Sequence, residues 1–232
     1  MTTPRDRLIV ALDVQDATTA RAMVDRLAGH VGMFKVGTQI FTAAGPDFVR
    51  EVIARGEKVF LDLKFHDIPN TVAGAVSSAG QLGVSLVDVH ALGGKDMMEA
   101  AVGALPATGI RLIAITILTS HEEETLGTIG VSGSVADSVR RLAVLSREAG
   151  ADGVVASPQE VALVREACGP DFLIVTPGIR PVGSSRGDQS RTATPAAAVA
   201  AGADYIVVGR PILEATDPAA AADAIVRELT GR

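Results

Sequence analysis

The feature that most constrains this chain is an alternation, repeated eight times, between short β-branched runs and longer Ala-rich segments. The short runs have the length and composition of buried strands, and they cover residues 8–14, 33–37, 58–65, 86–90, 111–119, 153–157, 172–177 and 205–209. The longer segments have helical periodicity, and they cover residues 17–29, 45–55, 70–81, 95–104, 135–149, 158–167, 194–201 and 218–229. Strands that alternate with helices indicate a parallel sheet. Eight such units in 232 residues favour a closed barrel, so we expect one α/β domain, a (β/α)₈ TIM barrel, over residues 1–232.

The composition excludes several classes of partner. The net charge is −6, and the chain has no long basic run interleaved with aromatic residues, which argues against a nucleic-acid surface. No stretch reaches the roughly 18 apolar residues of a membrane span, and the first residues lack the apolar core of a signal peptide. The single cysteine, Cys168, cannot form a disulfide within the chain and is typical of a reducing compartment. We therefore expect a cytoplasmic protein that binds neither nucleic acid nor membranes.

Charged side chains gather near the ends of the first three expected strands. Residues two apart on a strand point to the same face, which gives three rows that start apolar and then become charged: Ile9, Ala11 and Asp13; Met33, Lys35 and Gly37; Phe60, Asp62 and Lys64. In a parallel barrel these strand ends meet at one mouth, so Asp13, Lys35, Asp62 and Lys64 should converge there. Isolated buried charges are costly. An ion-pair network that only closes the barrel would explain one such pair, whereas four charges on three consecutive strands favour a catalytic cluster.

The aspartate beside this cluster leaves alternatives open. Asp67 follows Lys64 by three residues, and it could cap the helix that begins near Pro69, join the charged cluster, or do both.

No set of His, Cys, Asp and Glu has the spacing of a metal site. The carboxylates of Asp13 and Asp62 could hold Mg²⁺ in principle, but the neighbouring lysines compete for them. We therefore expect no metal and no cofactor.

A phosphate site is predicted at the last two strands. The eighth run ends in Gly209 and Arg210, and the seventh is followed by Gly178 and Arg180. Glycine lets a ligand approach the backbone closely, and an arginine can fork onto phosphate oxygens. Barrels of this type frequently bind phosphate with the loops after strands seven and eight. The polar, Gly-rich loop 180–191 is longer than usual for such a connection. A lone surface arginine is the alternative, but the combination favours phosphate binding.

The motifs resemble the orotidine 5′-monophosphate (OMP) decarboxylase family in its shorter, bacterial form. The resemblance covers nearly the whole chain and rests on segments in the expected order: Ala-Leu-Asp at 11–13, Phe-Lys-Val-Gly at 34–37, Asp-Leu-Lys-Phe-His-Asp-Ile-Pro-Asn-Thr at 62–71, Leu-Thr-Ser at 118–120, Pro-Gly-Ile-Arg at 177–180 and Val-Gly-Arg at 208–210. The segment at 62–71 is highly specific. The Val-Gly-Arg ending alone is weak, because several phosphate-binding barrels share it.

The resemblance implies an activity and the residues that carry it. The activity is decarboxylation of OMP to UMP and CO₂ in de novo pyrimidine biosynthesis, without cofactor or metal, with Lys64 protonating C6 of the pyrimidine. The implied catalytic network alternates in charge and comprises Lys35, Asp62, Lys64 and Asp67. It also implies a homodimer with shared active sites, in which Asp67, Ile68 and Thr71 enter the site of the partner subunit.

The remaining implied contacts divide the nucleotide among several segments. Asp13 and Lys35 contact the ribose, together with Asp67 of the other subunit, while Asp62 lies near the departing carboxylate. The other implied substrate-binding residues are Thr119 beside the base, Pro177, and Arg180, Gln189, Gly209 and Arg210 around the phosphate. Gln189, in a mobile loop at about 180–191, also reaches the base.

Two other functions remain as alternatives. The first is a Mg²⁺-dependent sugar-phosphate decarboxylase or lyase of the same barrel superfamily, similar to 3-keto-L-gulonate 6-phosphate decarboxylase or hexulose-6-phosphate synthase. Those enzymes share the Asp-x-Lys-x-x-Asp motif, but the Phe-Lys-Val-Gly segment, the Ile-Pro-Asn-Thr tail and Gln189 favour OMP decarboxylation. The second is a non-catalytic nucleotide-binding barrel, which would not need Lys64 among carboxylates.

Overall fold

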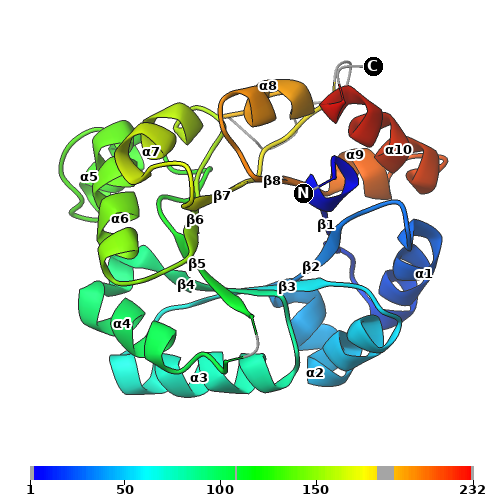
Figure 1. Ribbon diagram of the computed structural model, residues 1–232, viewed down its shortest axis with the longest axis horizontal. Helices are drawn as coiled ribbons and strands as arrows, with labels where there is room; N and C mark the ends of the chain where they lie inside the picture. The colour runs from blue at the N-terminus through cyan, green and yellow to red at the C-terminus, as the bar shows by residue number, and fades with distance from the viewer. Residues whose placement is uncertain (1–2, 108, 182–190, 231–232) are drawn as a thin grey trace.

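The structure is a computed structural model that describes residues 3–107, 109–181 and 191–230. Within these residues, parallel strands close into a barrel in sequence order, and helices surround it (Figure 1). The strands are β1 (Leu8–Ala11), β2 (Met33–Gly37), β3 (Val59–Phe65), β4 (Leu86–His90), β5 (Arg111–Ile115), β6 (Gly153–Val155), β7 (Leu173–Thr176) and β8 (Tyr205–Val208). Because β1 pairs with both β2 and β8, the sheet has no free edge. The predicted (β/α)₈ TIM barrel is confirmed.

The helices form the outer ring of the barrel (Figure 1). The α-helices are α1 (Ala17–Leu27), α2 (Thr38–Ala54), α3 (Pro69–Gln81), α4 (Lys95–Gly103), α5 (Glu123–Thr128), α6 (Val135–Glu148), α7 (Val161–Cys168), α8 (Pro195–Ala200), α9 (Arg210–Leu213) and α10 (Pro218–Leu229). Two short 3₁₀ helices, η1 (Arg5–Arg7) and η2 (Ala91–Gly93), precede β1 and α4. Among the described residues, no helix has both the length and the apolar character that crossing a membrane requires.

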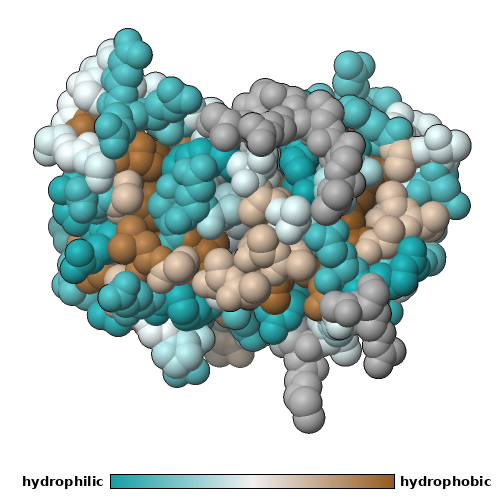
Figure 2. All heavy atoms as spheres, turned by 90° about the horizontal axis from the view of Figure 1, so that it is seen from above, coloured by the Kyte–Doolittle hydropathy of each residue, from teal (hydrophilic) through white to brown (hydrophobic). Residues whose placement is uncertain are grey.

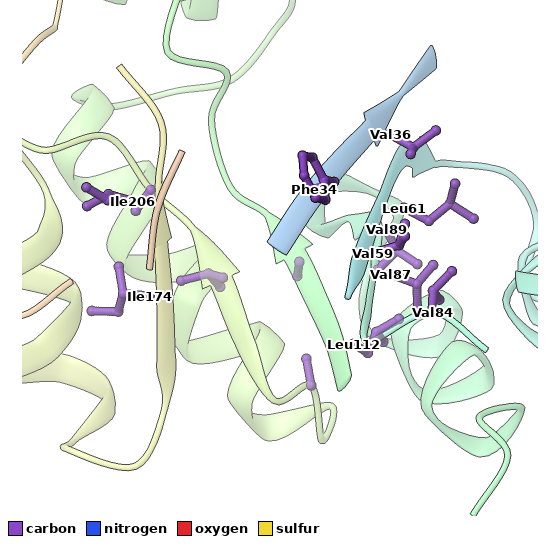
Figure 3. Packing of buried hydrophobic residues seen from close by; sticks show 14 of the residues in the cluster. Phe34, Val36, Val59, Leu61, Val84, Val87, Val89, Leu112, Ile174 and Ile206 are labelled. Atoms are coloured by element: carbon purple, nitrogen blue, oxygen red, sulfur yellow. The ribbon is translucent and has the colours of Figure 1, made fainter. Parts of the chain in front are cut away.

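Two apolar layers hold the barrel together, and strand alternation separates them. The inner layer fills the barrel with Ile9, Ala11, Met33, Phe60, Leu86, Ile113, Val175 and Val207. The outer layer packs the opposite strand faces against the helices, and Figure 3 shows part of it, including Phe34 and Val36 on β2 and Val59 and Leu61 on β3. In a side view, apolar side chains gather across the middle of the barrel wall and polar ones towards its two ends (Figure 2). Polar side chains are thus concentrated towards the two ends of the barrel.

Several boundaries differ from the sequence-based predictions. The strand predicted at 111–119 ends at Ile115, because both neighbouring strands stop there: Ile115 pairs with His90 on β4 and with Val155 on β6. The helix predicted at 45–55 is the second half of α2, whose two halves meet at Gly45 with a φ of 68°. Two short helices, α5 and α9, lie where the sequence predicts loops.

Polar side chains cap several of the helix starts. The side chain of Asp16 accepts a hydrogen bond from the Thr19 N–H, and that of Thr194 accepts one from the Ala197 N–H, as N-caps do. The helix predicted at 158–167 instead begins at Val161. Before this start, the hydroxyl of Ser157 is hydrogen-bonded to the carboxylate of Glu160, the N-cap residue of α7.

Candidate active site

A cavity of about 540 Å³ opens at the mouth formed by the carboxyl ends of the strands. This volume lies within the usual range for small-molecule sites. Most of the predicted site residues line it, namely Asp13, Lys35, Asp62, Lys64, Thr119, Pro177, Arg180, Gly209 and Arg210. Apolar inner-layer residues, including Ala11 and Phe60, form its floor. The predicted convergence of the charged strand ends is therefore confirmed.

The centre of the charged cluster is the carboxylate of Asp62, which is only 6% exposed. Its Oδ2 lies 2.9 Å from Nζ of Lys35, and its Oδ1 forms an ion pair with Nζ of Lys64. Burial alone would raise the pKa of Asp62, but the two ammonium groups outweigh it, so this pKa lies well below its usual value. Asp62 is therefore ionised at neutral pH and holds both lysines.

Lys35 links the carboxylate on β3 to the end of β1. Its Nζ lies 3.4 Å from Oδ1 of Asp13, in addition to its contact with Asp62. Burial alone would lower the pKa of Lys35, but Asp62 and Asp13 together raise it above its usual value. Gly37 makes room for the lysine, because a Cβ at that position would lie 3.0 Å from its Nζ. Lys35 is therefore a permanent cation whose head group is fixed from two sides.

Lys64 reaches the cluster through an irregular backbone. The pairing of β3 with β4 shifts register between Leu61 and Phe65, and Lys64 has a φ of 52°, in the left-handed region. A side chain in that conformation costs roughly 1–2 kcal/mol. The Lys64 N–H donates a hydrogen bond to Oδ1 of Asp88 at 2.7 Å, which offsets part of this cost. Regular alternation predicted the direction of Lys64 correctly, although the backbone here is a bulge.

Asp88 is a member of the cluster that sequence analysis missed. It lies on β4, two residues after the inward-facing Leu86, and it is completely buried. Burial raises the pKa of Asp88 well above its usual value, and the charge of Asp62 raises it further. The signal was available, since strand parity places Asp88 in the same inward row as Leu86.

Two histidines lie beside the cluster. The rings of His66 and His90 are stacked with centroids 5.3 Å apart. Burial, helped by the charges of His66 and Lys64, lowers the pKa of His90 to about 4. His90 is therefore neutral at physiological pH and adds no cation to the mouth.

The predicted phosphate end lies on the β7 and β8 side of the same cavity. Gly178, with a φ of 77°, and Arg180 follow β7, while Gly209 and Arg210 follow β8. One guanidinium nitrogen of Arg180, Nη1, donates to the Ile179 carbonyl at 2.9 Å. The cavity thus carries lysine–carboxylate pairs at one side and two arginines at the other. Gln189 lies outside the described residues.

A buried ion pair fixes the side chain of Arg191. Nη1 of Arg191 lies 2.9 Å from Oε1 of Glu160, and its Nη2 donates to the Leu118 carbonyl at 3.0 Å. The hydroxyl of Ser157 is hydrogen-bonded to the same Glu160. This contact ties residue 191 to the segment that carries Thr119, and nothing in the sequence pattern indicated it.

Three predicted site residues lie outside the cavity of their own chain. Asp67, Ile68 and Thr71 are all exposed, and Ile68 has 67% of its surface accessible. The Asp67 carboxylate accepts a hydrogen bond from the Ile68 N–H at 2.6 Å. Helix α3 begins at Pro69 with Ile68 at its N-cap and without a side-chain cap. The interpretation of Asp67 as a helix cap is therefore wrong.

Within residues 3–107, 109–181 and 191–230, no group of three or more His, Cys, Asp or Glu side chains is placed to hold a metal ion. The carboxylates of Asp13 and Asp62 instead face Lys35 from two sides. The two carboxylates that were considered as Mg²⁺ ligands are thus paired with a lysine.

Comparisons with known proteins agree with this geometry. Residues 6–225 match the model of a family described as "Orotidine 5'-phosphate decarboxylase / HUMPS family". Two similar relatives, from Moorella thermoacetica and Geobacter sulfurreducens, are named orotidine 5'-phosphate decarboxylase. Each is 54% identical over 97% of this chain, which covers 92% and 96% of those proteins. A crystal structure of orotidine 5'-phosphate decarboxylase from Lactobacillus acidophilus superposes with a TM-score of 0.86 at 40% identity, covering 96% of this chain and 98% of that one. With a match of this extent, the chain belongs to the orotidine 5'-phosphate decarboxylase / HUMPS family.

Proposed function

We propose that this protein decarboxylates OMP to UMP and CO₂, a step of de novo pyrimidine biosynthesis. The observation that carries the proposal is the position of the Lys64 ammonium, paired with buried Asp62 in a cavity whose other side carries Arg180 and Arg210. Such a cavity suits a ligand with a phosphate at one end and a reacting carboxylate at the other. The family description covers more than one activity, and the names of the relatives favour this one.

The chemistry requires the charges that the cavity provides. When the bond between C6 and the carboxylate breaks, its electron pair stays on C6 as a carbanion in the ring plane. The ring π system does not delocalise this pair, so the site must stabilise it electrostatically. We assign this role to the ammonium of Lys64, which then transfers a proton to C6 and is reprotonated by solvent. Asp62 keeps Lys64 charged and oriented. Its negative charge also repels the departing carboxylate.

The rest of the nucleotide would be bound away from the reacting carbon. We assign the ribose to Asp13 and Lys35, and the base to Thr119 and Pro177. The proposed phosphate ligands are Arg180, Gly209, Arg210 and Gln189, the last on the proposed mobile loop 180–191. Binding energy from such remote contacts can organise the reacting groups and favour loop closure.

The active protein would be a homodimer with shared sites. Asp67, Ile68 and Thr71 lie outside their own cavity, and exposed Ile68 suits contact with a second subunit. In the dimer, Asp67 would complete the alternating network and reach the ribose. We place the enzyme in the cytoplasm, in accord with a chain that has one cysteine, Cys168, and that one buried.

Turnover of OMP in the presence of excess EDTA tests the proposal. The ultraviolet absorbance of OMP should fall rapidly in both the presence and the absence of the chelator. Activity that EDTA removes and Mg²⁺ restores would favour the metal-dependent alternative. Nucleotide binding without turnover would favour a non-catalytic protein, and either result would contradict the proposal.

Replacement of Arg210 by alanine should raise KM for OMP by about 10- to 100-fold, the effect of losing a hydrogen bond to a charged group. The nucleoside orotidine, which lacks the phosphate, should bind equally weakly to both forms. Arg50→Ala provides a matched control, because Arg50 is exposed and pairs with Asp47 on α2, outside the cavity. Competition binding with both ligands measures the difference. An equal loss of affinity for orotidine would contradict a phosphate contact.

A further inference from the structure

Asp88 contacts the backbone of one site residue and lies beside another. Its Oδ1 accepts the 2.7 Å hydrogen bond from the Lys64 N–H. Its carboxyl group also neighbours that of Asp62: Phe60 pairs with Leu86, and Asp62 and Asp88 each follow two residues later on their strands. Asp88 is fully buried, so water does not supply alternative partners at its surface. The side chain therefore binds the backbone of Lys64 and lies beside Asp62, the two residues that the proposed reaction uses most directly.

A hydrogen bond between these two neighbouring carboxyl groups would require a proton. Two carboxylates only accept hydrogen bonds, and one must be protonated before it can donate. Both oxygens of Asp62 are occupied by ammonium groups, Oδ2 by Lys35 and Oδ1 by Lys64. By contrast, no N–H or O–H of the described residues donates to Oδ2 of Asp88. The proton therefore belongs on Asp88.

The local charge balance supports the same assignment. The groups that face one another are Lys35 on β2, Asp62 and Lys64 on β3, and Asp13 after β1. Within one chain, two cations and two anions balance without Asp88, and Asp67 of the partner subunit would add a third anion in the proposed dimer. An ionised Asp88 would therefore be an unpaired buried charge. Burial and the charge of Asp62 both raise the pKa of Asp88, in agreement with a neutral acid.

We propose that Asp88 is a positioning residue that works as a neutral acid, donating a hydrogen bond to Asp62 and fixing the left-handed backbone of Lys64. It acts through these two residues and does not line the cavity itself. If Asp88 were absent, the Lys64 N–H would lose its acceptor, and the backbone could relax from its φ of 52°. The ammonium group would then leave the position that the reaction requires.

The test compares Asp88→Asn with Asp88→Ala, and its activity arm rests on the proposed decarboxylation. Asparagine retains the Oδ1 acceptor and replaces the acid proton by an amide N–H. Asp88→Ala should lower kcat by on the order of 100-fold, as a misplaced catalytic group does. KM should change less than about threefold, because the phosphate contacts are intact. Asp88→Asn should restore kcat to within about threefold of the wild type. Equal damage by both substitutions would overturn the proposal, because it would mean that an ionised Asp88 is required.

A matched control separates positioning from stability. Asp152 Oδ2 accepts a hydrogen bond from the Leu112 N–H at 2.8 Å, the same kind of bond across neighbouring strands, but before β6, at the opposite end of the barrel. Asp152→Ala should lower the melting temperature and leave kcat unchanged. If it lowers kcat as much as Asp88→Ala does, the effect of Asp88 is one of stability, and the positioning role is wrong.

Two measurements without substrate keep this inference distinct from the proposed function. Infrared difference spectra of the wild type and Asp88→Asn at neutral pH should show a protonated-carboxyl C=O band in the wild type only. The raised pKa of Asp88 also means that folding takes up a proton above about pH 4, so this group lowers wild-type stability as pH rises. The melting temperature of Asp88→Asn relative to that of the wild type should therefore rise as the pH increases above about pH 4. A missing band, or a difference that does not change with pH, would overturn the neutral acid even if OMP is turned over.

Discussion

Replacement of Lys64 by alanine is expected to lower kcat for OMP by at least about 10⁴-fold, because one group would supply both proton transfer and electrostatic stabilisation. The ammonium groups of Lys35 and Lys64 both contact Asp62. Lys64 is the more accessible of the two, since 37% of its side chain is exposed against 12% for Lys35. Its loss leaves the arginines in place. We therefore expect UMP to bind the variant with little loss of affinity, which calorimetry can measure alongside single-turnover kinetics.

Lys58→Ala is the matched control for this experiment. Lys58 directly precedes β3 and is exposed, at the opposite end of the same strand from the cavity. Its removal should change neither kcat nor UMP affinity. If Lys64→Ala retains more than about 1% of the wild-type kcat, Lys64 is not the proton donor, since general acid catalysis alone contributes about 10²–10⁴-fold.

The parts of the site that the sequence predicted are those that follow from strand alternation. Asp13, Lys35 and Asp62 each lie two residues beyond an inward-facing apolar side chain, so their positions in the barrel mouth follow once the strands are identified. The two arginines follow from a different argument, namely their place beside glycines in the segments after β7 and β8, where such barrels frequently bind phosphate. Local periodicity is sufficient here because a closed parallel barrel places all strand ends at one mouth.

The parts that the sequence did not predict depend on contacts between distant segments. Where the register of β3 shifts, the Lys64 N–H donates to Asp88 on the next strand, 24 residues away. The pair between Arg191 and Glu160 joins segments 31 residues apart. Protonation of Asp88 depends on its burial against a second carboxyl group, which no pattern within one strand reveals. Contacts of this kind can be identified only once the three-dimensional packing is known.

The position of Asp67 bears directly on the proposed shared active site. In its own subunit, the carboxylate of Asp67 is exposed and hydrogen-bonded to the next backbone N–H, outside the cavity that contains Lys64. The proposed network therefore needs Asp67 from elsewhere. In a dimer with two-fold symmetry, each site would take Lys64 from one subunit and Asp67 from the other.

This arrangement predicts complementation between two inactive variants. Lys64→Ala and Asp67→Ala should each have very low activity alone, the second because the lysine loses a partner in its network. A hybrid dimer has one site in which both residues are wild-type and one in which both are replaced. Random reassortment of equal amounts should therefore restore about a quarter of wild-type activity, since half of the dimers are hybrids with one working site. Hybrids purified with two affinity tags should have about half of wild-type activity.

The reciprocal mixture distinguishes a shared site from general stabilisation by subunit exchange. When the wild type is reassorted with an equal amount of the double variant Lys64→Ala/Asp67→Ala, each hybrid site lacks one of the two residues. A shared site then leaves only wild-type dimers active, about a quarter of the total, whereas a site built within one chain leaves about half of the sites active. Activity near one half, together with hybrids of the single variants that remain inactive, would mean that Lys64 and Asp67 act within the same subunit, so that the site is not shared. The two mixtures thus test the same contact with opposite expectations, because the substitutions are separated in one and joined in the other.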